Sequence, residues 1–275
     1  MPFQPGLRHF ATVAVIATLI ASQASASQDS AGSGSYQDLV APFAEWRAFE
    51  QPPDRNGAPD YSAATFARRH QELMGYQQRL AAIREGSWPV EQQIDHQLLR
   101  AEMNGMDFYI RVLQPWARDP AFYKTVWTDQ SDTPAHEGTT HHRLAEIWTY
   151  EFPLSPTAAA KLAGELSVIP PLLEQARGNL TGNARDLWIT GTGTMQQQVS
   201  ALDALAEKTA ANGKRLRRAV RAAREATVGF VGWLQQQAPT KTGPSGVGKD
   251  NYDWNMRNVH LIPMTWDEEV DLLKR

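Results

Sequence analysis

Two stretches of this sequence hold residues whose types and spacing could do chemistry. In the first, His136 and Glu137 are followed by His141 and His142, which comes close to the pattern H-E-x-x-H. In that pattern two histidines on one helix face bind zinc, and the glutamate acts as general base. Here the histidines are five and six residues apart, and a proline and a glycine in the stretch predict a loop. We interpret it as a solvated or hydrogen-bonded histidine cluster, with a loop metal site as the alternative.

The second stretch, "GPSGVGKDNYDW" from Gly243 to Trp254, differs by one residue from the phosphate-binding loop G-x-x-x-x-G-K-[ST]. That loop needs a hydroxyl after its lysine to hold Mg²⁺, and it follows a buried strand. Here Asp250 follows Lys249, and the residues from Gln235 to Lys241 form no hydrophobic strand. We therefore predict no nucleotide site.

Other chemical signals are weaker. The basic run "KRLRRAVRAARE" carries Arg217, Arg221 and Arg224 at helical steps and could follow a phosphate backbone, but such a run is more typical of a solvated face, and we expect no nucleic acid partner. "GTGTM", from Gly191 to Met195, has neither a preceding strand nor a third glycine. The nine tryptophans are scattered singly, which is typical of core positions. The absence of cysteine excludes disulfides and thiolate chemistry.

The composition is that of a folded protein with an ordinary core. The chain has 275 residues, 42% hydrophobic and 21% charged, which predicts one large domain or two small ones. Its formal net charge of −3 gives no overall attraction to nucleic acid or to an acidic membrane.

The first residues predict export. Arg8 and His9 precede the apolar run "FATVAVIATLIA", which is too short to span a bilayer, and Ala24-Ser25-Ala26 is a small-x-small cleavage site. We expect a signal peptide at residues 1–26, a polar linker at 27–36 and no stable membrane span after cleavage. An uncleaved anchor is the alternative. The mature protein is expected to be periplasmic or secreted.

Two stretches carry apolar residues at three- and four-residue steps, which predicts amphipathic helices. The first begins at Ser62, ends near Gly86 and is expected to bury Phe66, Leu73, Tyr76, Leu80 and Ile83. The second ends near Pro115 and is expected to bury Val90, Ile94, Leu98, Met106, Tyr109 and Leu113.

Further helices are expected to start at Ser155 with Pro156 and at the Pro170-Pro171 pair, and to cover about 194–213 and 214–237. Thr265 and Glu268 form a capping box before a short final helix. No stretch alternates apolar and polar residues over a useful length. The predicted fold class is all-α, an array of roughly eight to ten helices with no sheet.

Three longer stretches together resemble one bacterial family, called domain of unknown function 885. They are "LLRAEMNGMDFYIRVLQPWARDPAFYKTVW", "IPPLLEQARGNL" and "VGKDNYDWNMRNVHLIPMTWDEEVDLL". The resemblance implies a mostly helical, often exported protein grouped with zincin-type zinc metallopeptidases. It also implies that relatives are considerably longer, with their histidine and glutamate segment after the "GKDNYDW" region.

Nothing in this chain matches that histidine and glutamate segment. The resemblance therefore implies a truncated helical domain at residues 37–275, similar to the N-terminal half of the family. It implies no catalytic, cofactor-binding or metal-binding residue here, and zinc only in full-length relatives.

In the family the "GVGKDNYDW" stretch connects the two halves. Glycines at 243, 246 and 248 permit a tight or left-handed backbone there. The residues expected to contact a substrate or another domain are Lys249, Asp250, Tyr252, Trp254 and Asn258.

The function expected from this resemblance is the N-terminal helical portion of an exported metallopeptidase-like protein that is inactive alone. The alternative is a complete, non-enzymatic helical module that binds a peptide or protein partner in the envelope, and a hydrolase using the histidine loop is a third. The expected partners are a peptide substrate or the missing C-terminal half. Trp266, Val270 and Leu273 form an apolar stripe on the last helix, so self-association is expected as well.

Overall fold

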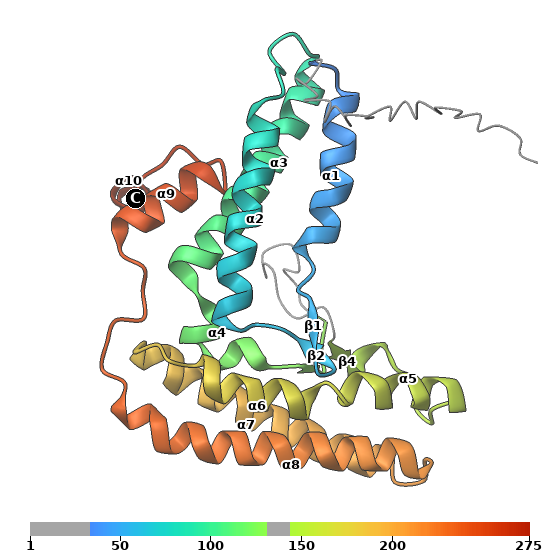
Figure 1. Cartoon of the computed structure of the whole chain (residues 1–275). Coiled ribbons are helices and arrows are strands. Elements are labelled where there is room, and N and C mark those ends of the chain that lie inside the picture. Colours follow the sequence, from blue (N-terminus) through green and yellow to red (C-terminus); the bar gives the residue numbers. More distant parts are fainter. Residues whose placement is uncertain (1–33, 131–143) are drawn as a thin grey trace, which may run out of the picture. The chain divides into compact units, whose positions relative to one another are not determined.

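The computed structural model describes residues 34–130 and 144–275, and in these residues the chain is mainly α-helical, as the sequence predicted (Figure 1). The α-helices are α1 (Gln37–Glu50), α2 (Ala63–Ala81), α3 (Val90–Phe108), α4 (Pro115–Arg118), α5 (Pro156–Leu166), α6 (Ile169–Asn179), α7 (Arg185–Lys208), α8 (Lys214–Gln237), α9 (Lys249–Asn258) and α10 (Trp266–Leu273). A π-helical turn, η1 (Tyr109–Leu113), extends α3, and a 3₁₀ turn, η2 (Pro120–Tyr123), follows α4.

The expectation of no sheet was wrong, because two short sheets are present. Strands β1 (Asp54–Arg55) and β2 (Ala58–Pro59) pair antiparallel, and β3 (Val126–Trp127) and β4 (Ala145–Glu146) pair parallel. Asn56 and Gly57, both at positive φ, join β1 to β2, and Asn-Gly is the strongest short hairpin signal. Strands of two residues are too short for a period-two pattern, so the alternation test could not find them.

The predicted helix starts are confirmed by their capping bonds. Ser62 Oγ accepts from the amide of Thr65, and Ser155 Oγ accepts from the amide of Ala158. At the last helix Thr265 forms the full capping box predicted. The helix expected from about residue 194 begins nine residues earlier, at Arg185, because two glycines and several β-branched residues weaken its sequence signal.

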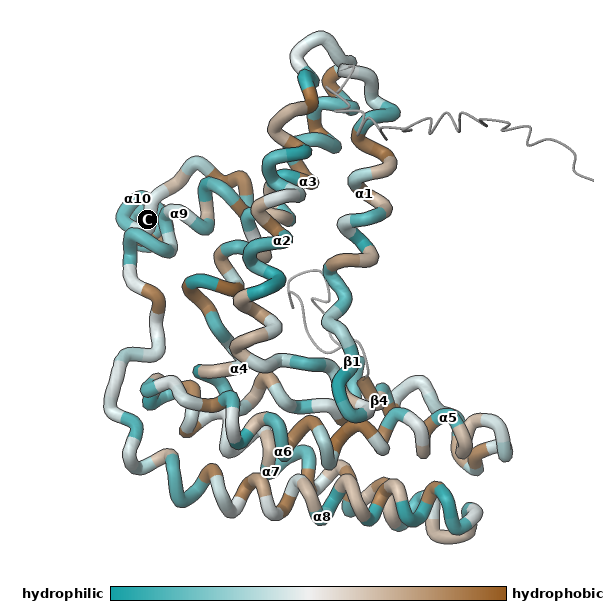
Figure 2. The backbone as a smooth tube through the Cα atoms, viewed as in Figure 1, coloured by the Kyte–Doolittle hydropathy of each residue, from teal (hydrophilic) through white to brown (hydrophobic). Residues whose placement is uncertain are grey.

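The helices pack in two neighbouring groups that share one hydrophobic core. Helix α8 packs against α5, α6 and α7, and α2 packs against α1 and α3 (Figure 1). Along α7 and α8, hydrophobic and hydrophilic residues alternate at helical steps (Figure 2). The largest fully buried side chains include Trp46, Tyr123, Trp188 and Phe230.

The apolar stripe predicted for α2 is confirmed, except that Tyr76 is only half-buried. The stripe predicted for α3 is largely wrong. Met106 is buried, but Val90, Ile94 and Leu98 are 66%, 50% and 49% exposed, and Leu113 is exposed. The buried face of α3 instead carries Leu99, Met103, Met106 and the imidazole of His96. Two apolar stripes lie side by side on this helix at helical spacing, and periodicity alone does not say which one meets α2.

Candidate functional site

The glycine-rich stretch before α9 is the connector, defined as residues 241–248. It follows α8 and a 3₁₀ turn instead of a strand, and three of its carbonyl groups face the Arg118 guanidinium. Arg118 donates from Nη2 to the carbonyl oxygen of Ser245 at 2.9 Å and lies within 3.5 Å of those of Pro244 and Gly246. A phosphate-binding loop presents amide N–H groups to its ligand. The backbone geometry therefore also argues against a nucleotide site.

The connector instead completes the start of α7, which has no side-chain cap from its own N-cap residue. The carbonyl of Gly243 accepts from the amide of Arg185 at 3.1 Å. Ser245 Oγ accepts from the amides of Asp186 and Leu187, at 2.8 and 3.3 Å. The first amides of a helix lack partners within the helix. The connector supplies the acceptors for three of these amides. A Cβ at Gly243 would lie 2.3 Å from the carbonyl oxygen of Asn183, and Gly248 has φ of 84°, as the sequence suggested for one of these glycines.

Replacing Ser245 by alanine should therefore lower the free energy of unfolding by about 1 kcal/mol, the usual loss when a helix-capping hydroxyl is removed. Urea denaturation measures it. Ser200→Ala is the matched control, because Ser200 lies within α7 and bonds only the carbonyl of Gln196. An equal effect of the two substitutions would contradict the capping role.

The five residues predicted as contacts all lie on α9, and four of them contact other helices. Lys249 forms an ion pair with Asp267 of α10, and the Tyr252 hydroxyl donates to Glu269 of α10. This hydrogen bond raises the pKa of Tyr252. Asp253 also accepts from the backbone amide of Trp266 at 2.7 Å. Helices α9 and α10 therefore form a hairpin held largely by polar contacts.

The opposite side of α9 lies on α3. The Trp254 ring stacks on Phe108 with centroids 5.7 Å apart and an interplanar angle of 8°. Asn104 donates from Nδ2 to the carbonyl oxygen of Asn258 at 3.1 Å. Gly105 makes room for this approach, since a Cβ there would lie 3.2 Å from Val259. Trp254 and Asn258 are therefore interhelical contacts, whereas Asp250 is exposed and has no ion pair or hydrogen bond with another described side chain.

Five large apolar side chains of α10 and of the turn that precedes it are exposed to solvent. We name them the hairpin surface; they are Leu261, Ile262, Trp266, Leu272 and Leu273, and the Trp266 ring also contacts the Tyr252 ring of α9 edge-on. Leu272 and Leu273 are 56% and 85% exposed, and neither α9 nor α10 buries any residue. The exposed stripe predicted for the last helix is thus present, although Val270 is half-buried.

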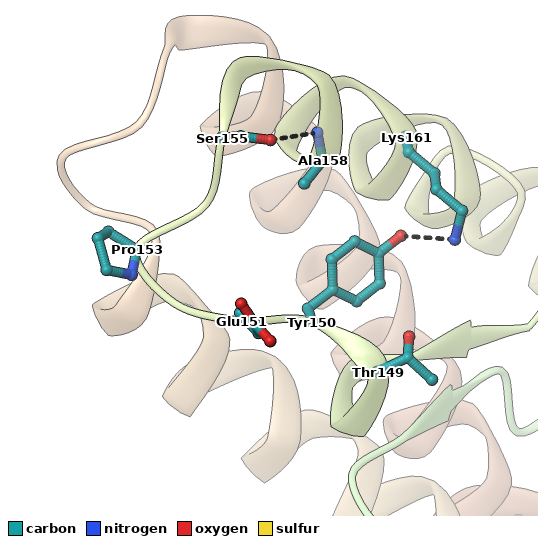
Figure 3. Close-up of a pocket in the computed structure, with 7 residues that line it drawn as sticks. All are labelled: Thr149, Tyr150, Glu151, Pro153, Ser155, Ala158 and Lys161. Atoms are coloured by element: carbon teal, nitrogen blue, oxygen red, sulfur yellow. Dashed lines mark hydrogen bonds between the residues drawn. The ribbon is translucent and has the colours of Figure 1, made fainter.

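A cleft of about 450 Å³ lies at the start of α5, and the sequence analysis missed it (Figure 3). Lys161 donates to the Tyr150 hydroxyl at 3.1 Å and to Glu165 Oε1 at 2.6 Å, and Tyr150 donates to Glu165 Oε2 at 2.7 Å. Only the i, i+4 pair of Lys161 and Glu165 could have been read from the sequence.

The surroundings of this cleft keep both Tyr150 and Lys161 protonated. Burial and the hydrogen bond to Glu165 raise the pKa of Tyr150. Hydrogen bonds to Glu165 and Tyr150 raise the pKa of Lys161. At neutral pH Tyr150 is therefore neutral and Lys161 is an ammonium ion, so neither is a general base. The cluster offers a hydrogen-bond donor to an acceptor group.

Comparison with known proteins assigns the family. The family described as "Bacterial protein of unknown function (DUF885)" matches residues 48–272, which include α2 to α9 and most of α10. The chain belongs to this family. No curated protein matches the chain.

One solved structure shows the fold of this DUF885 chain. It is that of "a putative lipoprotein of unknown function" from Shewanella oneidensis, with a TM-score of 0.59 and 17% sequence identity. The match covers 86% of this chain and 43% of that one. The chain therefore spans about half the length of the solved neighbour.

The zinc that the family resemblance implies does not fit the part of this DUF885 chain that the structure describes. No three histidine, aspartate or glutamate side chains among these residues come together to hold a metal ion. His136, Glu137, His141 and His142 lie outside the described residues. In the same described ranges, no helix is long and apolar enough to cross a membrane.

Proposed function

We propose that this chain is the N-terminal helical portion of a longer exported, metallopeptidase-like protein, and that it acts as a scaffold whose hairpin surface contacts a further domain. The peptidase class rests on the family resemblance, and export rests on the leader pattern of residues 1–26. The name lipoprotein given to the solved neighbour fits a protein of the cell envelope. The observation that carries the contact role is the set of exposed apolar side chains on α10 and on the turn that precedes it.

The exposed apolar side chains of α10 would stabilise a contact with another domain. Burying the exposed parts of Trp266, Leu272 and Leu273, which are 40%, 56% and 85% exposed, would contribute about 3 to 5 kcal/mol, at ~1.5 to 3 kcal/mol for each fully buried side chain. That is a large fraction of the whole stability of many domains. The family match extends through this hairpin to residue 272, so the hairpin belongs to the region that the family shares. The solved neighbour has more than half of its length outside the match, and such a region is the proposed occupant.

No catalytic step is assigned to the described residues, because no three histidine, aspartate or glutamate side chains among them come together to hold a metal ion. The role proposed for α9 is mechanical. Through Trp254 it is fixed to α3, and through Lys249 and Tyr252 it fixes α10. A domain that binds α10 would thereby be held at a defined position relative to the scaffold.

The coding DNA beyond the codon for Arg275 tests the proposal. We expect it to encode, in one of its frames, a helix carrying a histidine and glutamate segment. Unrelated sequence with its own promoter and start would contradict the proposal. It would favour the alternative, a complete binding module for a peptide or protein partner. The α5 cleft with its Lys161 donor is the observation on which that alternative depends.

The hairpin surface should also make the isolated chain associate with itself. Replacing Leu272 and Leu273 together by serine is expected to shift the protein towards monomer without lowering its thermal midpoint, because both side chains are largely exposed. Sedimentation velocity over a concentration series measures this. The control is Val90→Ser with Ile94→Ser, which removes equally exposed apolar residues from α3. Association that persists in the first variant, or disappears equally in the second, would count against the hairpin surface.

A further inference from the structure

The charge of the chain is distributed very unevenly. The segment from Lys208 to Arg224 contains seven lysines and arginines and no aspartate or glutamate. Of the 27 lysines and arginines in the chain, 20 then remain elsewhere, against 30 aspartates and glutamates. The small net charge of −3 therefore hides one strongly basic segment on an otherwise acidic protein.

Four of these cations form the basic stripe, which we define as Lys214, Arg217, Arg218 and Arg221. They follow one another at i, i+3, i+4 and i+7, which places them on one face over about 10 Å of α8. The buried residues Leu216, Val220 and Ala223 occupy the opposite side of the helix. All four cations are exposed, and Figure 2 shows hydrophilic residues in this part of α8, towards its connection with α7.

The stripe is not neutralised by the described residues. Arg224, just beyond it, pairs with Asp203 of α7. Arg217 donates to the backbone carbonyl of Asn212. Lys214, Arg218 and Arg221 have no ion pair or hydrogen bond to any residue that the structure describes.

The position of the stripe also opposes the stability of its own helix. The N-terminus of a helix carries partial positive charge and favours acidic residues. The first turn of α8 has none, and its N-cap residue, Gly213, gives no side-chain cap. The cations therefore do not serve the fold, whereas an anionic partner would stabilise both them and the helix end.

We propose that the basic stripe binds the surface of an anionic phospholipid bilayer. The cations spread along the outer face of a straight helix instead of converging on one point, which suits a plane of many negative charges better than one phosphate group. Anionic bilayers attract such clusters of four to eight cations. No aromatic residue lies between Lys208 and Arg224, so the stacking platform typical of single-stranded nucleic acid binders is missing.

The test uses protein produced with its own leader, so that export and processing take their natural course. Binding is measured by co-sedimentation with phosphatidylcholine vesicles that contain about one third phosphatidylglycerol, and with vesicles of phosphatidylcholine alone. We expect binding to the anionic vesicles only, abolished by high salt because mobile ions screen exposed charges. The variant Lys214→Gln, Arg218→Gln, Arg221→Gln should bind about 100-fold more weakly, at about fivefold for each cation.

The control variant, Arg84→Gln, Arg100→Gln, Arg275→Gln, removes the same charge from exposed positions elsewhere and should bind as the parent does. Equal binding to neutral vesicles, or equal losses in the two variants, would overturn the proposal. So would stripe-dependent binding to duplex DNA without binding to vesicles. The thermal midpoint of neither variant should fall below that of the parent, because every substituted side chain is exposed.

Discussion

Replacing Gln198 by methionine is expected to lower the free energy of unfolding by about 3 kcal/mol or more, because it leaves two buried amides without partners. Gln198 is fully buried, and its Oε1 accepts from the amides of Thr125 at 2.7 Å and Val126 at 3.0 Å. Its Nε2 donates to Thr227 of α8 at 3.2 Å. One side chain thus joins α7, β3 and α8, and methionine has similar length but cannot accept these bonds.

Urea denaturation of the parent and variant measures the effect. Gln197→Met is the matched control, since Gln197 is the preceding residue on the same helix and is exposed; its effect should stay within about 0.5 kcal/mol. A loss below 1 kcal/mol for Gln198→Met would show that water or a rearranged strand satisfies the two amides.

Replacing Gly191 by alanine should destabilise the fold by about 2 kcal/mol, in the range for overpacking a close contact. At this position α7 crosses the η2 turn so closely that a Cβ would lie 2.7 Å from the amide nitrogen of Ala121 and 2.9 Å from Cβ of Pro120. The backbone of η2 cannot move aside to relieve this contact, whereas the end of a flexible side chain could.

Gly193, two residues along the same helix, has nothing within 4 Å of an added Cβ. Gly193→Ala should therefore stabilise the protein by ~0.5 to 1 kcal/mol through helix propensity alone. Thermal denaturation of both variants gives the comparison. If both substitutions shifted the thermal midpoint in the same direction, that result would contradict the close crossing of α7 and η2.

The same two glycines show what the sequence could and could not reveal. "GTGTM" lies within α7, and its local pattern gives no sign that an added Cβ would meet the η2 turn at one glycine and nothing at the other. Helix starts at Ser62, Ser155 and Thr265 were predictable because their capping bonds are local in sequence.

In the candidate site, too, only features that are local in sequence could be predicted. The five residues expected to contact a substrate or another domain lie together because they belong to one helix, α9, but which neighbouring helix each of them meets depends on how α3 and α10 pack. The capping of α7 by Ser245 joins residues 59 positions apart, and the α5 cleft depends on a chain turn that brings Tyr150 to Lys161. Such long-range contacts follow from packing and leave no periodic pattern.

Hydrogen exchange of the monomeric chain, followed residue by residue, tests the contact role of the hairpin most directly. Helices that bury no side chain open easily, whereas core helices open only with global unfolding. The account predicts fast exchange for the amides of α9 and α10 and slow exchange for those of α7 and α8. Protection of α9 and α10 as strong as that of α7 and α8, in a protein that stays monomeric, would contradict it.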